Sequence, residues 1–558
     1  MRETSRRAPA VLHVLAAALT LTLLNALKPL TADDPSYYWH VQRFAAHPLD
    51  PYGGEMVFGE IWGPALHNVA PPVLIYWLAL GYRLIGDQPQ ILKLWLLPFP
   101  LLLAGASFAL LRRVAAGFER YGVWLIALSP AILPSLNLML DVPALALSLA
   151  ATALFLQAAD RNSWWLAAAA GALTGLAIQT KYTGFTVGLV LLATGWLRGR
   201  LRLAILAGTV AAALFLGWEA WVLGRYGESQ FFHFLGRRER GETGTSPFEL
   251  FRALVRTLGP LASPLIPLGL VALGAGRKWV VLAIVLVAAA HVAIAVTPES
   301  AYQLTFAWVG PVLLLVAAAV TWRMNTRRGR RTMLRGTAPR LRGDFAVRFL
   351  TVWLAIELLA YLSISTFPAA RRTLGVLIVL VLITSWLVSR AIRLVHWRRS
   401  LVWGVVALSM ALGFFYFAVD LDDAQSERKT PARVRDLVAA RGGGSIYYLS
   451  TSWCGFQFYA PREGLHPVVP GRTNFSRGDW LVIPWNVQVR NRLTLADSSV
   501  AFVEVVPWAR RLPISTRDAY YRGTRPLRRP EADWRAADLY RVDESGQIVG
   551  VQEHPYMP

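Results

Sequence analysis

The amino-acid sequence predicts a polytopic, all-α membrane protein followed by a soluble C-terminal α/β domain. Of its 558 residues, 55% are hydrophobic and only 16% are charged, which is a far more apolar composition than that of a soluble enzyme. Apolar runs of about 20 residues recur between Ala10 and Val419, and each can cross the hydrocarbon layer as a helix. After Val419 the sequence becomes polar and aromatic. A cytosolic globular enzyme is therefore excluded.

The first apolar run, Ala10 to Leu30, follows Arg2, Arg6 and Arg7. Because this run is too long for the apolar part of a signal peptide, we interpret it as an uncleaved first span with a cytoplasmic N-terminus. The basic clusters between later runs then mark cytoplasmic loops and give about 13 spans. These clusters are Arg112 to Arg120, Arg161, Arg198 to Arg202, Arg277 with Lys278, Arg323 to Arg342, and Arg390 to Arg399.

The net charge of +23 invites a nucleic-acid interpretation, which its distribution excludes. Residues 420–558 hold 19 Lys and Arg against 16 Asp and Glu, a balance of +3, so most of the excess lies in loops of residues 1–419. The densest cluster has eight arginines and no acid between Arg323 and Arg342. We expect residues 323–345 to be a cytoplasmic loop that sets topology, the alternative being a site for lipid head groups or a partner.

This topology places several segments on the outer side, and the first of them is residues 31–70. Residues 31–70, directly after the first span, contain five acids, one arginine and many aromatic residues, and are too long for a plain connector. The aromatic residues suit either an interfacial belt or a wall for a lipid or sugar. Pro71 to Gly86 is expected to be a partial or interfacial helix, because only one crossing can join Ala70 outside to Arg112 inside.

Residues 420–558 are expected to form the extracytoplasmic domain, on the outer side because the number of crossings is odd. Helical periodicity runs from Glu427 to Ala440, and strand-like runs cover Ser445–Ser450, Trp480–Pro484 and Val500–Val506. Residues 1–419 form the predicted transmembrane domain.

Several charged residues stand where a membrane helix ends. Asp33 and Asp34 follow the first span, where they are either a solvated helix end or a general base with its orienting partner. Asp141 is either an ordinary turn aspartate or a functional carboxylate, because an ionisable group flanked by apolar sequence is costly unless it faces a polar cavity. Lys181 and the pair Arg371–Arg372 are predicted on the outer side, against the positive-inside rule, and suit a phosphate.

The sequence does not indicate a metal or a nucleotide. His40, His47 and His67 share the first outer segment, but their spacing matches no standard metal motif, and solvated or stacked imidazoles are expected instead. Cys454 is the only cysteine, so disulfides and cysteine-based zinc sites are excluded. No Gly-rich phosphate loop is present. A divalent metal stays possible without being implied.

These motifs together resemble the GT-C glycosyltransferases of the protein O-mannosyltransferase and aminoarabinose-transferase type, in their bacterial forms. The resemblance rests on the acid pair with Tyr37 downstream, the Pro71–Pro72 helix start, the Met-x-Asp-x-Pro turn at Asp141, and the Thr-Lys-Tyr span end at Lys181. It covers roughly residues 1–200. Two departures are Asp34, where the family has Glu, and Val69–Ala70 before the prolines, where aminoarabinose transferases have Glu-Lys.

The resemblance implies a membrane glycosyltransferase that takes a sugar from a polyprenyl phosphate and passes it, with inversion, to an extracytoplasmic hydroxyl of a protein, glycolipid or cell-wall glycan. It implies the bacterial plasma membrane as the location. Asp33 would be the base and Asp34 its partner, with Lys181 and Arg371 or Arg372 on the phosphate. The residues expected to orient the substrates are Tyr37, Asp141 and Tyr182. The alternative from another class is a transporter or flippase of polyprenyl-linked sugars.

Overall fold

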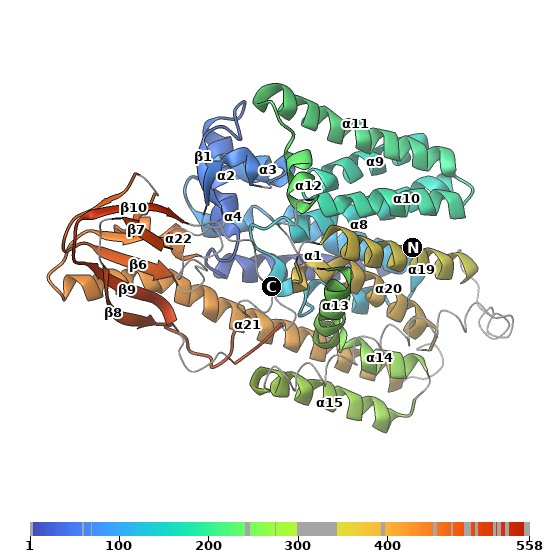
Figure 1. Cartoon of the computed structure of the whole chain (residues 1–558). Coiled ribbons are helices and arrows are strands. Elements are labelled where there is room, and N and C mark those ends of the chain that lie inside the picture. Colours follow the sequence, from blue (N-terminus) through green and yellow to red (C-terminus); the bar gives the residue numbers. More distant parts are fainter. Residues whose placement is uncertain are drawn as a thin grey trace.

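The computed structural model describes most of the chain, and every structural statement below concerns the described residues. These are 4–58, 61–68, 70–239, 246–273, 275–297, 343–365, 367–391, 397–449, 455–469, 472–484, 493–496, 500–516, 521, 526–529 and 535–551. The predicted basic loop 323–345 and Cys454 lie almost entirely outside these ranges. A bundle of helices makes up one end of the molecule and a sheet domain the other (Figure 1).

The first part of the bundle starts with α1 and continues through an outer segment that carries a short hairpin. Its helices and strands are α1 (Thr4–Leu27), α2 (Asp34–Ala46), β1 (Glu55–Phe58), β2 (Ile61–Pro64), η1 (Ala65–His67), α3 (Pro72–Ile85), α4 (Pro89–Leu94), α5 (Pro98–Val114), α6 (Glu119–Ala127), α7 (Ile132–Ser135) and α8 (Asp141–Arg161). Helix α2 starts where Pro35 occupies its first turn, a position at which proline costs no hydrogen bond.

The second part of the bundle packs on the first through contacts of α9, α10 and α11 with α8, and of α20 and α21 with α5, α6 and α7. Its elements are α9 (Trp164–Ile178), η2 (Tyr182–Gly184), α10 (Phe185–Leu197), α11 (Leu201–Tyr226), α12 (Gln230–Glu239), α13 (Pro247–Ala262), α14 (Leu265–Ala272), α15 (Arg277–Val296), α19 (Gly343–Ile364), η3 (Ala370–Thr373), α20 (Leu374–Ala391) and α21 (Trp397–Ala439).

The helices are long and apolar enough for a multi-pass membrane protein. Among the described residues, seven helices could cross a membrane, or eight if α13 and α14, which meet at 75°, form one broken span. Four shorter apolar helices accompany them, one of which is Pro72–Ile85. At 14 residues, α3 is about 21 Å long, less than the hydrocarbon thickness. The count of about 13 spans stays a prediction.

The C-terminal domain contains two sheets. The larger has the order β4-β3-β6-β9-β8, with parallel pairing of β3 to β4 and β6 and antiparallel pairing of β9 to β6 and β8. The smaller has the order β5-β10-β7. The elements are β3 (Ile446–Tyr448), α22 (Phe456–Tyr459), η5 (Pro461–Glu463), β4 (His466–Pro467), β5 (Asn474–Phe475), β6 (Trp480–Pro484), β7 (Leu493–Ala496), β8 (Val500–Pro507), β9 (Arg535–Val542) and β10 (Gly546–Val551).

The central strand β6 is buried on both faces. Trp480 and Val482 join one hydrophobic cluster, which includes residues of α21, whereas Leu481 and Ile483 join a second cluster on the opposite face. This alternation is the period-2 pattern of a strand. The helix predicted over residues 427–440 and the strands predicted over 445–450, 480–484 and 500–506 are confirmed as the end of α21 and as β3, β6 and β8.

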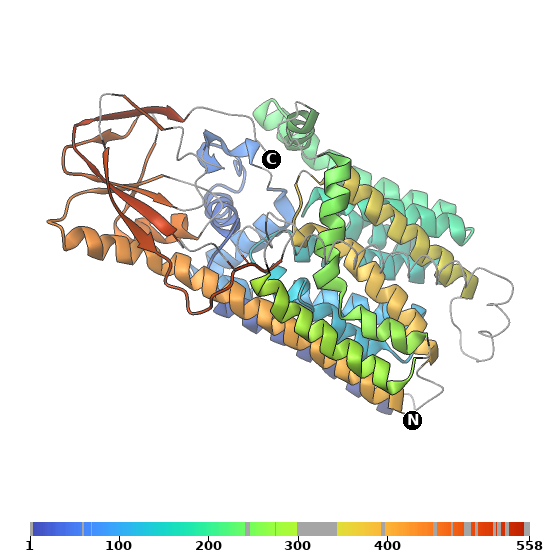
Figure 2. The ribbon, with the colours of Figure 1, turned by 60° about the horizontal axis from the view of Figure 1, so that its bottom comes forward.

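Helix α21 joins the bundle to the sheet domain. Its 43 residues correspond to about 65 Å of helix, and Figure 2 shows it running along the bundle and continuing under the sheets. The predicted boundary between residues 419 and 420 therefore falls inside a continuous helix. Buried contacts reinforce the junction: Lys28 at the end of α1 pairs with Asp420 at 2.7 Å, and Glu427 accepts hydrogen bonds from Thr31 and from the Gly455 amide.

Candidate functional site

Four charged side chains from four separate segments form a continuous chain of ion pairs. Arg371 Nη1 lies 2.7 Å from Asp33 Oδ2 and 3.8 Å from Asp141 Oδ2. The other oxygen of Asp141 accepts a hydrogen bond from Lys181 Nζ. The structure thus brings together Asp33, Asp141, Lys181 and Arg371, which the sequence analysis selected separately. We call these residues, with Arg372, the charged cluster.

Each member of the charged cluster stands at or just before the N-terminus of a helix. Asp33 is the N-cap of α2 and Asp141 is the first residue of α8. Lys181 directly precedes η2 and α10, and Arg371 lies in η3, which leads into α20. Because the first amide groups of a helix have no intrahelical acceptor, they carry partial positive charge. The convergence of these ends creates a positive region that favours carboxylates and phosphates.

The cluster has more cations than anions. Arg371 and Lys181 are neutralised by Asp33 and Asp141, whereas Arg372 has no carboxylate within ion-pair distance in the described part of the chain. Its guanidinium lies over the Phe367 ring, 3.9 Å from the ring centroid, and its Nε has no hydrogen-bond acceptor among the described groups. The cluster therefore retains one positive charge, and Arg372 is the cation with capacity for a further anion.

The members differ in how far they reach the surface. The side chains of Arg371 and Asp141 are 9% and 5% exposed, whereas those of Asp33 and Lys181 are 20% and 23% exposed. Asp33 and Lys181 therefore form the accessible side of the cluster. The Arg371 guanidinium and the Asp141 carboxylate form the buried side.

Tyr37 lies one helical turn after Asp33, and its amide donates to the Asp33 carbonyl. Burial raises the pKa of its phenol well above the usual value, and the carboxylates of Asp33 and Asp141 raise this pKa further, while Arg371 opposes them. The hydroxyl stays protonated at physiological pH. It is available beside the charged cluster as a neutral hydrogen-bond donor.

Asp34 does not share the environment of Asp33. It is completely buried, and its carboxylate accepts hydrogen bonds from the Leu138 amide at 2.9 Å and the Thr31 amide at 3.3 Å. Lys93 Nζ lies 3.3 Å away. Successive residues of a helix point about 100° apart, so the first acid faces the cluster while the second faces the core. The structure therefore places the predicted second catalytic acid in a supporting position, where it holds the turn that leads to Asp141.

Replacement of Asp34 by alanine is expected to destabilise the protein by about 3–5 kcal/mol, because it leaves the buried Lys93 ammonium and two amides without their carboxylate. Thermal unfolding in detergent measures this change. The matched control is Glu55→Ala, since Glu55 pairs with Arg472 at the surface and its loss is expected to cost about 1 kcal/mol or less. Equal unfolding temperatures for the two variants would contradict the supporting role.

Tyr182, predicted to orient substrate, is 5% exposed and packs against Phe231 outside the charged cluster. Its hydroxyl lies 3.5 Å from Glu219 Oε1, and Glu219 also accepts hydrogen bonds from Ser229 and the Phe231 amide. The short helix η2 turns successive side chains to different sides. The Lys181 side chain therefore contacts Asp141, whereas the hydroxyl of the neighbouring Tyr182 contacts Glu219.

An apolar crevice lies one to three helical turns beyond the cluster. It is narrow and lies between α8, α10, α19 and α20. Helix α8 begins at Asp141, and α10 and α20 begin a few residues after Lys181 and Arg372. Its lining includes Leu145 and Leu149 of α8, Val187 of α10, and Ile378 of α20. Glu357 also faces it, and accepts a hydrogen bond from Trp353 Nε1 at 3.1 Å. The arrangement places a mostly apolar space directly behind a cationic one.

The sequence analysis did not identify three polar residues near the site, two buried lysines and an asparagine. Lys93 and Lys28 are fully buried, and Lys93 donates to the Lys28 and Pro29 carbonyls in addition to its contact with Asp34. Lysines inside apolar runs are the signal that could have identified them. Asn137, next to Leu138, donates to the Tyr521 hydroxyl of the C-terminal domain at 3.1 Å. The two residues of this contact are 384 positions apart in the chain, and no local sequence pattern indicates that they meet.

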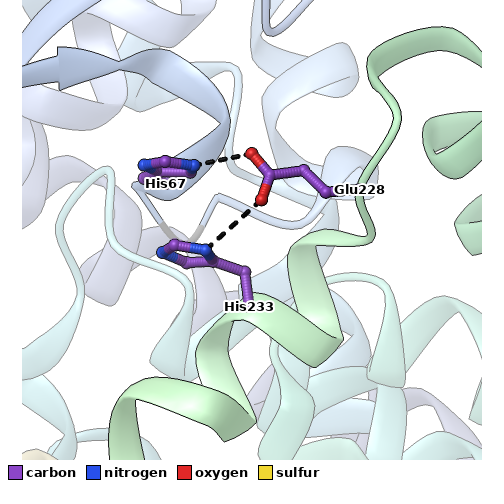
Figure 3. Close-up of side chains that lie close together, drawn as sticks. All are labelled: His67, Glu228 and His233. Atoms are coloured by element: carbon purple, nitrogen blue, oxygen red, sulfur yellow. Dashed lines mark hydrogen bonds and ion pairs between the residues drawn. The ribbon is translucent and has the colours of Figure 1, made fainter.

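One further group combines metal-ligating residue types. His67, Glu228 and His233 lie together, with ligand atoms all within 4.8 Å of one another (Figure 3). His67 precedes the Pro-Pro start of α3, whereas Glu228 and His233 lie between α11 and α12 and at the start of α12. As expected for a histidine of the first outer segment, His67 is stacked, but its partner is the imidazole of His233. The spacing of the three residues follows no motif.

Comparisons with known proteins return structural similarities only. No family model matches, and no curated protein matches. Among solved structures, the oligosaccharyltransferase of Archaeoglobus fulgidus has a TM-score of 0.47 and 14% identity over 85% of this chain and 68% of that chain. A second structure of the A. fulgidus enzyme, AglB with an inhibitory peptide and dolichol phosphate, has a TM-score of 0.45, 12% identity, and 86% and 70% coverage.

The third similar structure is ArnT of Cupriavidus metallidurans bound to undecaprenyl phosphate. It has a TM-score of 0.41 and 16% identity over 95% of this chain and 97% of that chain. At these identities and TM-scores, no residue role passes from these proteins to this chain.

Proposed function

We propose that this protein is a membrane glycosyltransferase that moves a sugar from a polyprenyl-phosphate donor to a hydroxyl acceptor at the outer membrane surface. One observation carries the proposal: two carboxylates and three cations meet near the starts of four helices, next to a narrow crevice lined mostly by apolar side chains. A lipid phosphate ester requires a cationic place for its phosphate and an apolar place for its chain. The carboxylate supplies the base that the acceptor needs.

The donor phosphate must compete with the ion pairs of the charged cluster when it binds. In the structure, Arg371 is held by Asp33 and Asp141, and Lys181 by Asp141. A phosphate oxygen that approaches Lys181, Arg371 and Arg372 competes for these cations with the carboxylates. As Arg371 turns its hydrogen bonds to the phosphate, the Asp33 carboxylate loses its ion-pair partner, and its oxygens become free to contact the acceptor hydroxyl. Donor binding thereby prepares the base.

The transfer itself is a displacement at the anomeric carbon. The acceptor oxygen forms the new bond to this carbon while the bond from the carbon to the phosphate oxygen breaks with its electron pair. The acceptor proton passes to Asp33, and the polyprenyl phosphate leaves as an anion beside Lys181, Arg371 and Arg372. Attack opposite the leaving phosphate gives inversion. Tyr37 donates a hydrogen bond to an oxygen of the sugar or acceptor, and Asp141 keeps Lys181 and Arg371 in place.

The C-terminal domain contributes to this function by supporting the site and by facing the acceptor. Tyr521 donates to Asp420 at 3.1 Å, and Asp420 also binds Lys28. The Leu30 amide donates to the Tyr459 hydroxyl at 3.0 Å, which links the sheet domain to the start of the first outer segment. These contacts hold the domain over the first outer segment, where it can select a protein, glycolipid or cell-wall acceptor.

The membrane assignment proposed here is the bacterial plasma membrane, with a cytoplasmic N-terminus and an extracytoplasmic C-terminal domain. It is supported by the basic clusters between apolar runs. In Figure 2 the N-terminus and the sheet domain lie at opposite ends of the bundle, as this orientation requires. Residues 1–419 and 420–558 are the proposed membrane and outer domains, although α21 continues through both.

A flippase or transporter of lipid-linked sugars is the competing proposal. It would be expected to use charged residues along a path through the membrane, often at paired broken helices. The charged cluster instead gathers at one set of helix N-termini, a placement that favours chemistry at one face of the bundle.

The deciding experiment measures transfer of labelled sugar from a panel of synthetic polyprenyl-phosphate sugars. Purified full-length protein in detergent is given cell lipid and protein extracts as acceptors, and reconstituted vesicles report donor movement between leaflets. Transfer by the wild type supports the enzyme. Movement between leaflets without transfer to any acceptor would favour the flippase.

The two tyrosines are expected to respond differently to loss of the hydroxyl. Tyr37→Phe is expected to lower the transfer rate about 10-fold, the effect of losing about one hydrogen bond in the transition state. Tyr182→Phe is expected to change it less than about 3-fold, because that hydroxyl contacts Glu219. Initial rates with saturating donor measure both. A larger effect at Tyr182 would overturn this placement.

A further inference from the structure

The group formed by His67, Glu228 and His233 lies on the outer segments and belongs to no part of the charged cluster. His67 Nε2 is 2.6 Å from Glu228 Oε1, and His233 Nδ1 is 3.6 Å from Glu228 Oε2. Figure 3 shows one nitrogen of each imidazole directed at the two oxygens of the same carboxylate. All three side chains are partly exposed, at 37%, 43% and 19% for His67, Glu228 and His233. A solute can therefore reach the group.

The two imidazoles stack on each other beside the carboxylate. The rings are nearly parallel, at 9°, with centroids 3.9 Å apart. Each ring presents one nitrogen to Glu228, so that two imidazole nitrogens and a carboxylate come together from two outer segments. Imidazole nitrogen is a common metal ligand in proteins.

The ligand set points to zinc rather than to magnesium or calcium. Two imidazole nitrogens and one carboxylate are a common set for Zn²⁺ with an open fourth position, whereas Mg²⁺ and Ca²⁺ prefer oxygen ligands alone. Tetrahedral zinc with bonds of about 2.0 Å separates its ligands by about 3.3 Å. The ligand atoms here lie within 4.8 Å of one another, so small side-chain rotations would bring them to the separation that a bound zinc ion requires.

A bound metal would join two outer segments that already touch. Gln230, between Glu228 and His233, donates to the Leu66 and Asn68 carbonyls on either side of His67. The Asn68 side chain in turn donates to Ser36 at 2.6 Å on α2, one turn after Asp33. These contacts hold the backbone of both segments in place around the three ligands, which reduces the cost of ordering them.

We propose that His67, Glu228 and His233 form a zinc-binding site with one coordination position open to water or another ligand. The site fastens α12 to η1. It does not rest on the proposed glycosyl transfer, because the residues lie outside the charged cluster and the binding of metal alone tests it.

The test uses the full-length protein in detergent, purified with an affinity tag that lacks histidine and stripped with EDTA. Zinc is then titrated against a chromophoric chelator, and bound metal is counted by mass spectrometry. We expect one equivalent in the wild type, a Kd increased at least about 10-fold in His67→Ala, His233→Ala and Glu228→Gln, and a zinc-dependent rise in Tm that these variants lose. His47→Ala, which removes an exposed histidine of the same segment, is the control and is expected to bind normally.

Cobalt substitution of the wild type keeps the proposal testable if a variant fails to fold. Tetrahedral Co²⁺ with nitrogen and oxygen ligands gives intense visible absorption bands. Added zinc is expected to displace the cobalt ion and abolish these bands. Binding of less than about 0.1 equivalent of zinc by the wild type, or binding that all three substitutions leave unchanged, would overturn the site. Both outcomes are independent of whether the protein transfers sugar, so failure here and failure of the proposed function are distinguishable.

Discussion

In the Asp33→Asn variant, the rate of sugar transfer is expected to fall by about 10²- to 10⁴-fold, the usual contribution of a general base. Asparagine keeps the size of the side chain and its place at the N-cap of α2, but it cannot accept the acceptor proton. It also removes the negative charge 2.7 Å from Arg371, which frees the guanidinium for phosphate. Donor affinity is therefore expected to stay equal or to increase while turnover is lost.

Single-turnover kinetics with labelled donor, together with equilibrium binding of unreactive polyprenyl phosphate, separate the two effects. The matched control is Asp87→Asn, because Asp87 is an exposed acid that pairs with Arg462 outside the charged cluster. This control is expected to transfer within about 3-fold of the wild type. Retention of transfer in Asp33→Asn would remove Asp33 as the base and weaken the proposed mechanism at its centre.

Arg371→Ala has the second large expected effect, a loss of about 10²- to 10³-fold in kcat, comparable to the loss of one donor that stabilises developing negative charge. Arg371 is the link between both carboxylates of the cluster, and its fork-shaped guanidinium can meet two phosphate oxygens. Without it, the leaving phosphate loses a cation that stabilises its developing negative charge. The KM for donor is expected to rise as well.

Arg371→Lys distinguishes charge from geometry. Lysine keeps the positive charge but not the fork, so we expect it to recover donor affinity better than turnover. Arg462→Ala serves as the control, since it removes an arginine from an exposed pair with Asp87. Steady-state kinetics over a range of donor concentrations give kcat and KM for each variant. Wild-type values in Arg371→Ala would show that the phosphate binds elsewhere.

The membrane fold is readable from local sequence because each span is decided by its own residues. A run of about 20 apolar residues must form a helix in lipid, where backbone groups have no water to bond. The end of α21 and the strands β3, β6 and β8 were predicted for a similar reason, since periodicity reports which face of an element is buried. The number of spans is a weaker inference, because short apolar helices such as α3 satisfy the same pattern without reaching across the hydrocarbon.

For the candidate site as well, some properties could be predicted from the sequence and others only from the tertiary structure. The sequence by itself identified Asp33, Asp141, Lys181 and Arg371 as unusual, because charged groups at the ends of apolar runs are costly unless they serve a purpose. Only the tertiary structure decided that they meet, since the contact between Asp33 and Arg371 joins residues 338 positions apart. It also left Arg372 over Phe367 with capacity for a further anion, a distinction that two adjacent arginines do not reveal.

Because local sequence does not determine which distant residues meet, some residues have surroundings that differ from those predicted. Asp33 and Asp34 are chemically identical and adjacent, yet one faces the cluster and the other is buried against Lys93. His67 has its partners in Glu228 and His233, more than 160 positions along the chain. A sequence records which groups are costly to bury and where a helix begins. The direction of each side chain and its distant neighbour depend on packing of the whole chain, and those two properties determine whether a charged residue supports the fold or contacts a substrate.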